Sequence, residues 1–202
     1  MWSGTMDDYT FTSDRDFLLR DGDLCVRPVC DRTQDYVILS GWLQNPRVLE
    51  FFGGRDQHHS LEAIREKYAP KQPDQSDLFP CLIEFLDRPV GFIQFDQLRP
   101  EELSRFGYSP QEIVYRVDLF IGETDLWGYG LGRRALRIVT RHLFQARSAS
   151  QVVSNPQVDN PRAVRSYLAA GFRNVKLLPR HQLHEGQLRD CYLMEADNDQ
   201  RI

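Results

Sequence analysis

The stretch "DLWGYGLGRRALRIV" at residues 125–139 decides the fold. It places Gly128, Gly130 and Gly132 within five positions, and an apolar pattern of helical period follows at once. Glycine adopts positive φ and lets a ligand approach the backbone, and the N-terminus of a helix attracts anions. The stretch therefore predicts either a plain tight connection from a strand to a helix or a turn whose backbone N–H groups converge on an anion.

Two well-known phosphate loops are excluded by the glycine spacing. A dinucleotide fingerprint needs G-x-G-x-x-G, whereas here a single residue separates each glycine from the next, which gives G-x-G-x-G. A P-loop needs G-x-x-x-x-G-K-[ST], which the sequence lacks. An anion-binding turn at this place belongs to another class of loop.

The chain has the size and composition of one globular unit. Its 202 residues are 41% hydrophobic and 27% charged, which suffices for one sizeable core. We expect a flexible tail over residues 1–16 and a single domain over residues 17–202. No run of about 18 apolar residues is present to span a bilayer, and no signal peptide is evident. These features predict a cytoplasmic protein with no membrane partner, and they leave the oligomeric state open.

Cysteine usage and net charge argue against two further kinds of site. Cys25, Cys30, Cys81 and Cys191 form no C-x-x-C pair and have no histidine at ligand spacing, so neither a metal site nor a disulfide framework is predicted. The formal net charge of -4 argues against nucleic acid as the main partner, because that binding needs clustered Lys and Arg.

The order of expected elements predicts the α/β class. Hairpins are expected around Asp21 and Gly22, around residues 87–89, and between residues 172–179 and 188–196. Helices are expected over residues 31–42, 61–68 with Ser60 as N-cap, 130–146, and 161–170 with Asn160 as N-cap. Residues 113–121 and 150–155 read as strands, and residues 99–111 as a loop. Antiparallel strands followed by alternating strands and helices imply a central mixed sheet.

The glycine stretch resembles the acetyl-CoA loop of the GNAT acetyltransferases, whose pattern is Q/R-x-x-G-x-G/A. Trp127, Gly130 and Gly132 occupy its defined positions, so tryptophan stands where the family usually has Gln or Arg. The segment "DNPRAVRSYLAAGF" is similar to the family's N-x-x-A-x-x-x-Y-x-x-x-G-F, with Asn160 and Tyr167 in register. Their spacing of seven residues, about two helical turns, puts both on one side of a helix. The resemblance implies the GNAT acyltransferase fold, a central mixed and mostly antiparallel sheet flanked by helices.

The resemblance also implies acetyl-CoA as the acyl donor. Backbone N–H groups near residues 120–122 would polarise the acetyl carbonyl as an oxyanion hole does, a contribution worth roughly 3 kcal/mol. Tyr167 would protonate or hydrogen-bond the departing CoA thiolate. The residues implied in binding acetyl-CoA are Phe120, Ile121, Gly122, Trp127, Gly128, Tyr129, Gly130, Leu131, Gly132, Arg133 and Asn160.

Over residues 24–195 the chain is similar to the aminoglycoside 6'-N-acetyltransferases. Asp118 stands on the strand before the loop, where that family has an aspartate that contacts the amine to be acetylated. An ammonium group has no lone pair, so a carboxylate that holds the cation and receives its proton suits the reaction. The resemblance assigns catalysis to Asp118 and Tyr167, and it implies a small cationic acceptor acetylated at a 6'-amino group.

The acceptor pocket matches that family in part. The residues implied in binding the acceptor are Phe51, Phe52, Tyr68, Gln94 and Asn155. Asn155 stands where the family has an aspartate in a T-D-P segment, which removes one carboxylate partner for a polycationic sugar. The alternatives are therefore an N-acyltransferase for another amine, such as a siderophore lysine side chain or a protein N-terminus, and a CoA-binding module without catalysis.

Overall fold

The computed structural model describes residues 17–57, 59–71 and 77–198. The flexible tail expected at residues 1–16 lies outside the described residues, and the single domain over 17–202 stays a prediction. The strands are β1 (Leu19–Asp21), β2 (Leu24–Pro28), β3 (Phe79–Phe85), β4 (Arg88–Gln97), β5 (Val114–Ile121), β6 (Gln151–Ser154), β7 (Arg173–His184) and β8 (Gln187–Asp197). The helices are α1 (Thr33–Trp42), α2 (Pro46–Leu49), α3 (Leu61–Tyr68), α4 (Pro100–Phe106), α5 (Leu131–Ala146) and α6 (Pro161–Ala170).

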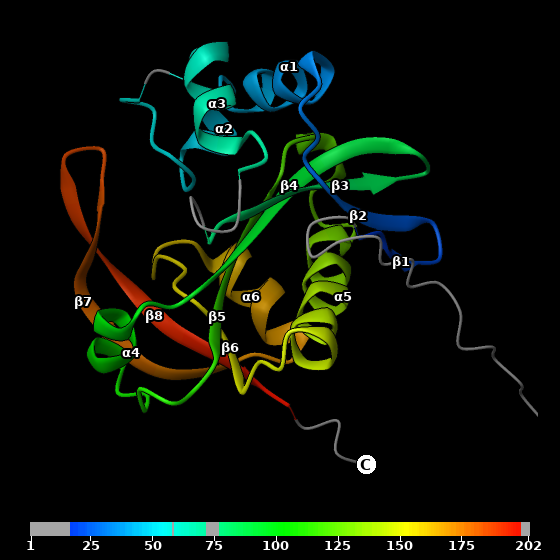
Figure 1. The fold of residues 1–202 in the computed structure, drawn as a ribbon. Helices are drawn as coiled ribbons and strands as arrows, with labels where there is room; N and C mark the ends of the chain where they lie inside the picture. The colour runs from blue at the N-terminus through cyan, green and yellow to red at the C-terminus, as the bar shows by residue number, and fades with distance from the viewer. Residues whose placement is uncertain (1–16, 58, 72–76, 199–202) are drawn as a thin grey trace, which may run out of the picture.

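All eight strands form one sheet in the order β1-β2-β3-β4-β5-β6-β8-β7 (Figure 1). β5 and β6 run parallel, whereas the other neighbouring strands are antiparallel. The prediction of a mixed, mostly antiparallel sheet flanked by helices is confirmed. In the part of the chain that is described, no helix is long and apolar enough to cross a membrane.

The first half of the sheet is covered on both faces, because side chains alternate along each strand. On β3, Cys81 and Ile83 pack in the same cluster as Leu136 of α5. Leu82, between them, packs in a second cluster with Leu39 of α1. Figure 1 shows α1, α2 and α3 on one side of these strands and α5 on the other. The two clusters fix the first half of the sheet between its helices. The site lies beyond them, where β5 and β6 separate.

Most predicted elements are found within a few residues of their expected bounds. Asp21 and Gly22 lie at the β1–β2 turn, and the Ser60 hydroxyl accepts a hydrogen bond from the backbone N–H of Ala63 at 3.1 Å. The Asn160 side chain caps α6 in the same way, and Gly171 ends that helix with φ of 103°. These capping interactions are the reason why the helix bounds were predictable.

The loop expected over residues 99–111 is wrong, because residues 100–106 form α4. Pro100 is the first helical residue, where its missing N–H costs no hydrogen bond. The backbone N–H of Arg99 donates to the Glu102 carboxylate at 3.3 Å, and Gly107 ends the helix with φ of 89°. The proline and glycine that suggested a loop are the start and stop signals of a helix.

The central strands separate where the site lies. β5 pairs with β6 as far as Arg116, which lies opposite Val153. Among the described residues, no strand pairs with residues 117–121 of β5 on that edge. The N–H of Gly122 donates to Val90 of β4 at 2.9 Å. Since successive backbone groups alternate in direction, the N–H and C=O of Leu119 and Ile121 point to the open edge.

Gly122 is required for packing, which gives a stability prediction. A Cβ at this position would overlap the indole ring of Trp42. We expect Gly122→Ala to lower the free energy of unfolding by about 1–3 kcal/mol through overpacking, measured by urea denaturation. Gly41→Ala is the matched control, because a Cβ there meets nothing within 4 Å and alanine favours the helix interior by about 0.5–1 kcal/mol. Equal stability of Gly122→Ala and the native protein would contradict the proposed role.

Candidate active site

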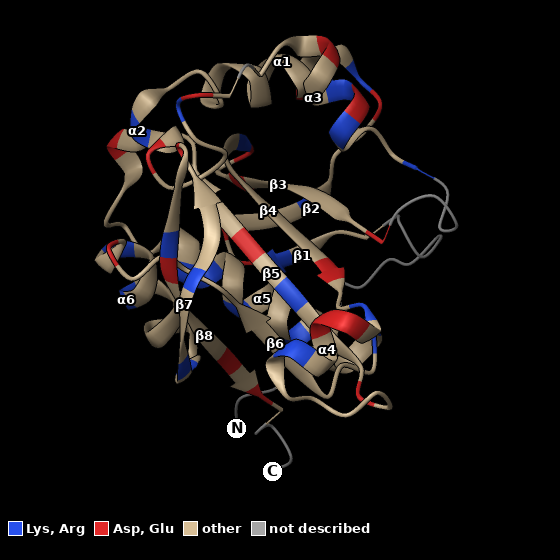
Figure 2. Cartoon of the chain, turned by 90° about the vertical axis from the view of Figure 1, so that its left-hand side faces the viewer, with Lys and Arg blue, Asp and Glu red and all other residues tan. Residues whose placement is uncertain are grey.

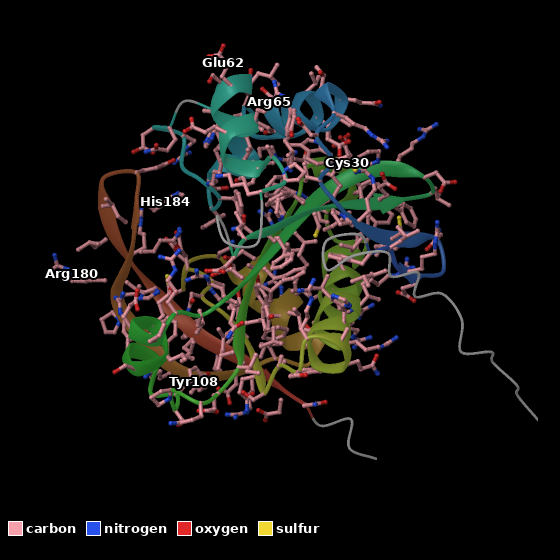
Figure 3. All side chains as sticks on the ribbon, in the orientation of Figure 1. Cys30, Glu62, Arg65, Tyr108, Arg180 and His184 are labelled. Atoms are coloured by element: carbon pink, nitrogen blue, oxygen red, sulfur yellow. The ribbon has the colours of Figure 1, made fainter. Side chains whose placement is uncertain are left out.

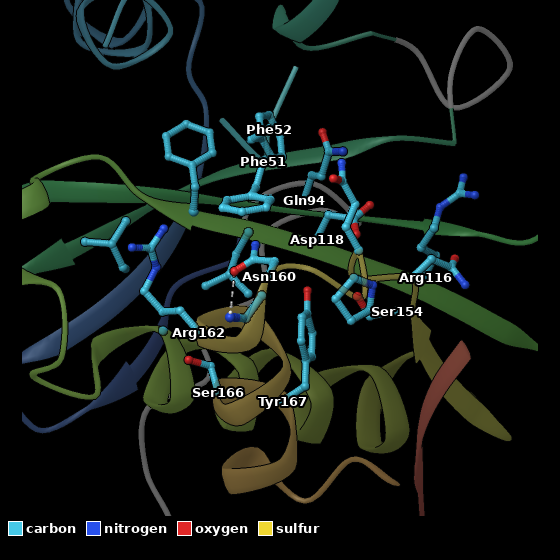
Figure 4. Close-up of a pocket in the computed structure, with 18 of the residues that line it drawn as sticks. Phe51, Phe52, Gln94, Arg116, Asp118, Ser154, Asn160, Arg162, Ser166 and Tyr167 are labelled. Atoms are coloured by element: carbon cyan, nitrogen blue, oxygen red, sulfur yellow. Dashed lines mark hydrogen bonds between the residues drawn. The ribbon is translucent and has the colours of Figure 1, made fainter. Parts of the chain in front are cut away.

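A cleft of about 1290 Å³ opens at the separation of β5 and β6. Its walls come from α2 and the segment after it, β4, β5, α4, the glycine loop and α6. Figure 4 shows Asp118, Gln94 and Arg116 reaching into it from the strands, and Asn160, Arg162, Ser166 and Tyr167 from the side of α6. Both predicted catalytic residues therefore lie in one cavity.

Asp118 is half-buried in the cleft, opposite Gln94 in the β4–β5 register. Burial raises the pKa of the Asp118 carboxyl above its ordinary value of 3.8. The charge of Arg116 and hydrogen bonding from Gln94 and Ser154 act in the opposite direction. A partly desolvated carboxylate with a raised pKa is suited to receive a proton.

The end of the cleft around Asp118, called the acceptor end here because the predicted acceptor residues Gln94 and Asn155 also line it, contains an ionic network. The Arg116 guanidinium contacts Asp96 at 2.6 Å and Glu102 of α4 at 2.7 Å. Burial raises the pKa of Asp96 to about 6, although Arg116 lowers it. Figure 2 shows acidic and basic segments close together on β5 and α4. Arg116 thus neutralises part of the negative charge at this end of the cleft.

Tyr167 projects from α6 towards the open edge of β5. It is 4% exposed, and its hydroxyl donates to the backbone oxygen of Val117 at 3.3 Å. Burial raises the pKa of Tyr167, and the charge of Asp118 raises it further. The phenol therefore stays protonated at neutral pH. Its hydroxyl can donate a hydrogen bond beside Asp118, because Val117 directly precedes that residue.

The glycine loop has the backbone geometry that its sequence predicts. Gly128 and Gly130 have φ of 90° and 79°, and Gly130 is the N-cap of α5. The first turn of α5 begins at Leu131, so its unpaired N–H groups lie directly after the loop. Gly128 to Arg133 all line the cleft. Together with the open edge of β5, this loop fits a ligand that has both phosphate and amide groups.

Asn160 and Trp127 also line the cleft, each with one group already engaged. The Asn160 oxygen accepts from the N–H of Ala163 at 3.1 Å as the α6 cap. The indole N–H of Trp127 donates to the backbone oxygen of Ile121 at 2.8 Å. Trp127 therefore fixes the glycine loop to the end of β5.

The structure places two predicted site residues, Gly122 and Tyr68, outside the lining of the cleft. Gly122 does not line the cleft, and its N–H is bound to Val90. Tyr68 is 2% exposed and packs with its ring centroid 5.0 Å from that of Phe92, behind the wall of the cleft. The backbone of Phe120 faces β4, as that of Gly122 does, so only its side chain reaches the cleft. The N–H groups that point to the open edge of β5 are therefore those of Leu119 and Ile121, and not those of residues 120 and 122.

The remaining predicted acceptor residues do line the cleft. Phe51 and Phe52 form part of one wall, and the Phe52 ring lies 4.7 Å from that of Phe120. The side-chain oxygen of Gln94 and the side-chain nitrogen of Asn155 are buried with no hydrogen-bond partner among the described residues. An acceptor with N–H and hydroxyl groups would satisfy both atoms.

The β7–β8 hairpin joins the segment that bears the aromatic wall. Glu185 accepts two hydrogen bonds from the Arg55 guanidinium, at 2.6 and 2.7 Å. The His184 ring contacts the backbone oxygen of Glu50 at 2.9 Å. Figure 3 shows His184 on the side of the hairpin that faces this segment. These contacts hold the wall in place from the far end of the sheet.

Sequence reasoning missed several side chains that line the cleft. The period of two along β5 places Arg116, Asp118 and Phe120 on one face, a signal that identifies Arg116. No local signal identifies Asp96, because its contact depends on the register between β4 and β5. The other lining residues that were not predicted include Arg47, Leu119, Ser154, Arg162, Arg165 and Ser166.

Comparison with known proteins agrees with this geometry. The family model described as "Acetyltransferase (GNAT) domain" matches residues 31–179. The aminoglycoside N(6')-acetyltransferase type 1 of Klebsiella pneumoniae is 25% identical over 138 residues, 68% of this chain and 69% of that protein. AAC(6')-Ib in complex with ribostamycin and coenzyme A has a TM-score of 0.68 at 21% identity, covering 88% of this chain and 94% of that one. Spermidine N-acetyltransferase from Vibrio cholerae has a TM-score of 0.71 at 15% identity, covering 89% and 98%.

The chain belongs to the GNAT acetyltransferase family. It is an acetyltransferase, and acetyl-CoA is its acyl donor. The fold predicted from the glycine loop and the asparagine–tyrosine segment is confirmed. Bound acetyl-CoA supplies an activated acetyl thioester, and the residues that would hold it are those of the loop, the open edge of β5 and the start of α6.

The loop gives a prediction for binding of the donor. We expect Gly130→Val to raise the dissociation constant of acetyl-CoA at least about tenfold, which is ~1.4 kcal/mol. The branched side chain blocks the approach to the loop backbone and disfavours the positive φ of 79°. Isothermal titration calorimetry measures the constant.

Gly186→Val separates loss of the ligand site from backbone strain. Gly186 has φ of 71°, lies in the β7–β8 turn and does not line the cleft. Gly186→Val should therefore lower the free energy of unfolding about as much as Gly130→Val does, and it should leave the affinity for acetyl-CoA unchanged. Unchanged affinity in folded Gly130→Val would remove the loop from the donor site.

Proposed function

We propose that the protein acetylates a primary amine of a small cationic acceptor, of which an aminoglycoside with a 6'-amino group is the best fit. The observation that carries this proposal is the position of Asp118 on β5. Its carboxylate faces the acceptor end of the cleft, one residue beyond the carbonyl that Tyr167 contacts. A proton acceptor for the amine and a proton donor for the leaving thiolate thus flank the same point.

The chemistry follows from these two groups. The Asp118 carboxylate holds the ammonium group and receives or relays its proton, which frees the nitrogen lone pair. N–H groups on the open edge of β5 stabilise the negative charge on the acetyl oxygen. As the new C–N bond forms and the C–S bond breaks, the Tyr167 hydroxyl supplies a proton to the departing thiolate. The second proton of the nitrogen restores the phenol, and Asp118 releases its proton to solvent, so one proton is released for each acetyl group transferred. Direct transfer in this way needs no covalent intermediate on the protein.

The polar lining of the acceptor end supports a hydrophilic amine. Gln94 offers an unpaired oxygen to an N–H group, and Asn155 an unpaired nitrogen to a hydroxyl. Glu101 lines the same end of the cleft and can contact a second cation. An aminocyclitol or amino sugar carries both amine and hydroxyl groups, so it matches this lining better than an apolar amine does.

A second candidate is an amine of another class, and the ionic network favours it. Arg116 already pairs with Asp96 and Glu102, and Asn155 provides no charge. The acceptor end therefore has less free negative charge than its carboxylate content suggests. A siderophore lysine side chain or a protein N-terminus presents fewer cationic groups than a polycationic sugar, so it needs fewer carboxylate contacts.

A panel of acceptors tests both candidates through release of free CoA thiol. The panel pairs an aminoglycoside bearing a 6'-amine with one bearing a 6'-hydroxyl, and adds spermidine, lysine and an N-terminal peptide. We expect turnover with the 6'-amine, none with the 6'-hydroxyl, and a product heavier by one acetyl group. Turnover with spermidine alone would keep a small cationic acceptor and exclude the sugar, whereas turnover with lysine or the peptide alone would support the second candidate. No turnover in a protein that binds CoA would favour a binding module.

A further inference from the structure

Arginines gather where the glycine loop meets α2 and α6. Arg47, Arg162 and Arg165 all line the cleft. Among the described residues, no carboxylate lies within ion-pair distance of any of the three. Burial lowers the pKa of Arg162; the charge of Glu50 raises it, and the charges of Arg47 and Arg165 lower it further. Like charges held together without a counter-charge indicate an anion site.

Trp127 holds two of these cations. The guanidinium of Arg162 lies 3.6 Å from the centre of the indole ring, and that of Arg47 lies 4.6 Å from it. The indole itself is fixed by its hydrogen bond to Ile121. A ring attracts a cation through its face without neutralising it. Unlike a carboxylate partner, the ring occupies none of the N–H donors of the two arginines, so those that Arg47 does not use on Thr124 remain for a ligand.

The arrangement links the two sides of the cleft. Arg47 belongs to α2, and it also donates to the Thr124 hydroxyl at 3.1 Å. Arg162 is in the first turn of α6, two residues after its N-cap. Trp127 directly precedes Gly128, the first residue of the phosphate-fitting turn. The arginines therefore lie beside the loop and not at the acceptor end around Asp118.

We propose that Arg47 and Arg162, positioned by Trp127, bind a phosphate group of coenzyme A. This inference rests on acetyl-CoA as donor and is independent of the identity of the amine. Trp127 stands where related loops usually have Gln or Arg, and here a neutral ring replaces one polar contact by placing two guanidinium groups. Arginine suits this role because its planar N–H donors match phosphate oxygens in pairs.

Calorimetry of CoA binding tests the proposal without catalysis. We expect Arg162→Gln and Arg47→Gln each to raise the dissociation constant of CoA at least about tenfold. The loss of affinity with added salt should also be smaller in each variant, because one ionic contact is missing. Arg141→Gln, on an exposed part of α5 outside the cleft, is the control and should bind CoA as the native protein does.

Two further ligands identify the phosphate. If the 3'-phosphate is bound, 3'-dephospho-CoA should bind the arginine variants and the native protein equally well. If the pyrophosphate is bound, the tenfold difference should persist with 3'-dephospho-CoA. In both cases pantetheine, which has no phosphate, should bind all the proteins alike. A variant that weakens pantetheine to the same extent as CoA would overturn the proposal by showing general damage to the cleft.

Trp127 is a positioning residue, and two variants test whether its aromatic face is what positions the arginines. Trp127→Phe keeps an aromatic face and should stay within about threefold of native affinity for CoA, whereas Trp127→Leu should match the arginine variants. Adding Arg162→Gln to Trp127→Leu should then cost little more. Native CoA affinity in both arginine variants would overturn the proposal. Failure of CoA to bind the native protein would instead contradict the donor site itself, as would an unaffected Gly130→Val.

Discussion

Replacing Asp118 with asparagine should lower kcat/KM about a hundredfold or more, because the change keeps the shape and removes both the charge and the proton acceptor. The residue lies in the cleft beside Gln94, and acetyl-CoA lies along the open edge of β5 in the proposed complex. The measurement is thiol release with an acceptor that the native protein acetylates. CoA affinity, measured by calorimetry, should be little changed.

The pH dependence adds a second readout of the same group. The pKa of Asp118 is raised, chiefly by burial. Because the base must be ionised, activity should fall as pH decreases through that raised value, so the acidic limb of kcat/KM lies above the range of an ordinary aspartate. The variant should lack this limb.

The contribution of Asp118 to stability depends on pH in the opposite direction to its contribution to activity. A carboxylate whose pKa is raised on folding stabilises the native state only when protonated, and that contribution is lost as pH rises from 3.8 to the raised pKa. At neutral pH, Asp118→Asn should therefore be at least as stable as the native protein. Asp87→Asn, an exposed turn residue outside the cleft, is the matched control and should leave rate and stability unchanged. Native kcat/KM in Asp118→Asn would contradict the proposed amine site.

What could be predicted from the sequence depends on local signals. The glycine loop, the Ser60 and Asn160 caps and the hairpin turns are determined by neighbouring residues, and all were found where expected. α4 was missed because Pro100 and Gly107 occur in loops as often as at helix ends. The correct reading needed the acidic residues of the first turn, which favour a helix start.

The rest of the site depends on contacts between distant segments. Arg116 meets Asp96 because β4 and β5 pair in one register, and a shift by one residue would separate them. The family resemblance places Gly122 in the donor site. In the structure its backbone N–H faces β4 and it packs against Trp42, eighty positions earlier in the chain, which no local signal indicates. The same holds for Tyr68, because the sequence pattern of an aromatic residue on a helix is the same whether the residue faces the core or a cleft.

Tyr167→Phe should lower kcat about a hundredfold while CoA affinity stays nearly native, because the hydroxyl matters most as negative charge develops on the leaving sulfur. With a pKa raised above its ordinary value of 10.0, the phenol is protonated at neutral pH, so it can donate a hydrogen bond to the leaving sulfur and cannot act as a base. In the structure the hydroxyl donates to Val117 at the rather long distance of 3.3 Å. A weak bond of this kind can be exchanged for a bond to the thiolate at small cost.

Loss of that hydrogen bond could also reduce stability, so a tyrosine outside the cleft provides the control. Tyr36 donates to Asp31 at 2.9 Å and is buried on α1. Tyr36→Phe should cost about 1 kcal/mol of folding free energy, as any lost hydrogen bond does, and leave kcat unchanged. Tyr167→Phe should lower the free energy of unfolding about as much as Tyr36→Phe does, but only Tyr167→Phe should lower kcat. The comparison requires that chemistry limits the rate, which single-turnover measurements establish. Under that condition, a kcat within twofold of native in Tyr167→Phe would assign Tyr167 to packing between α6 and β5, and the proton for the thiolate would then have to come from solvent.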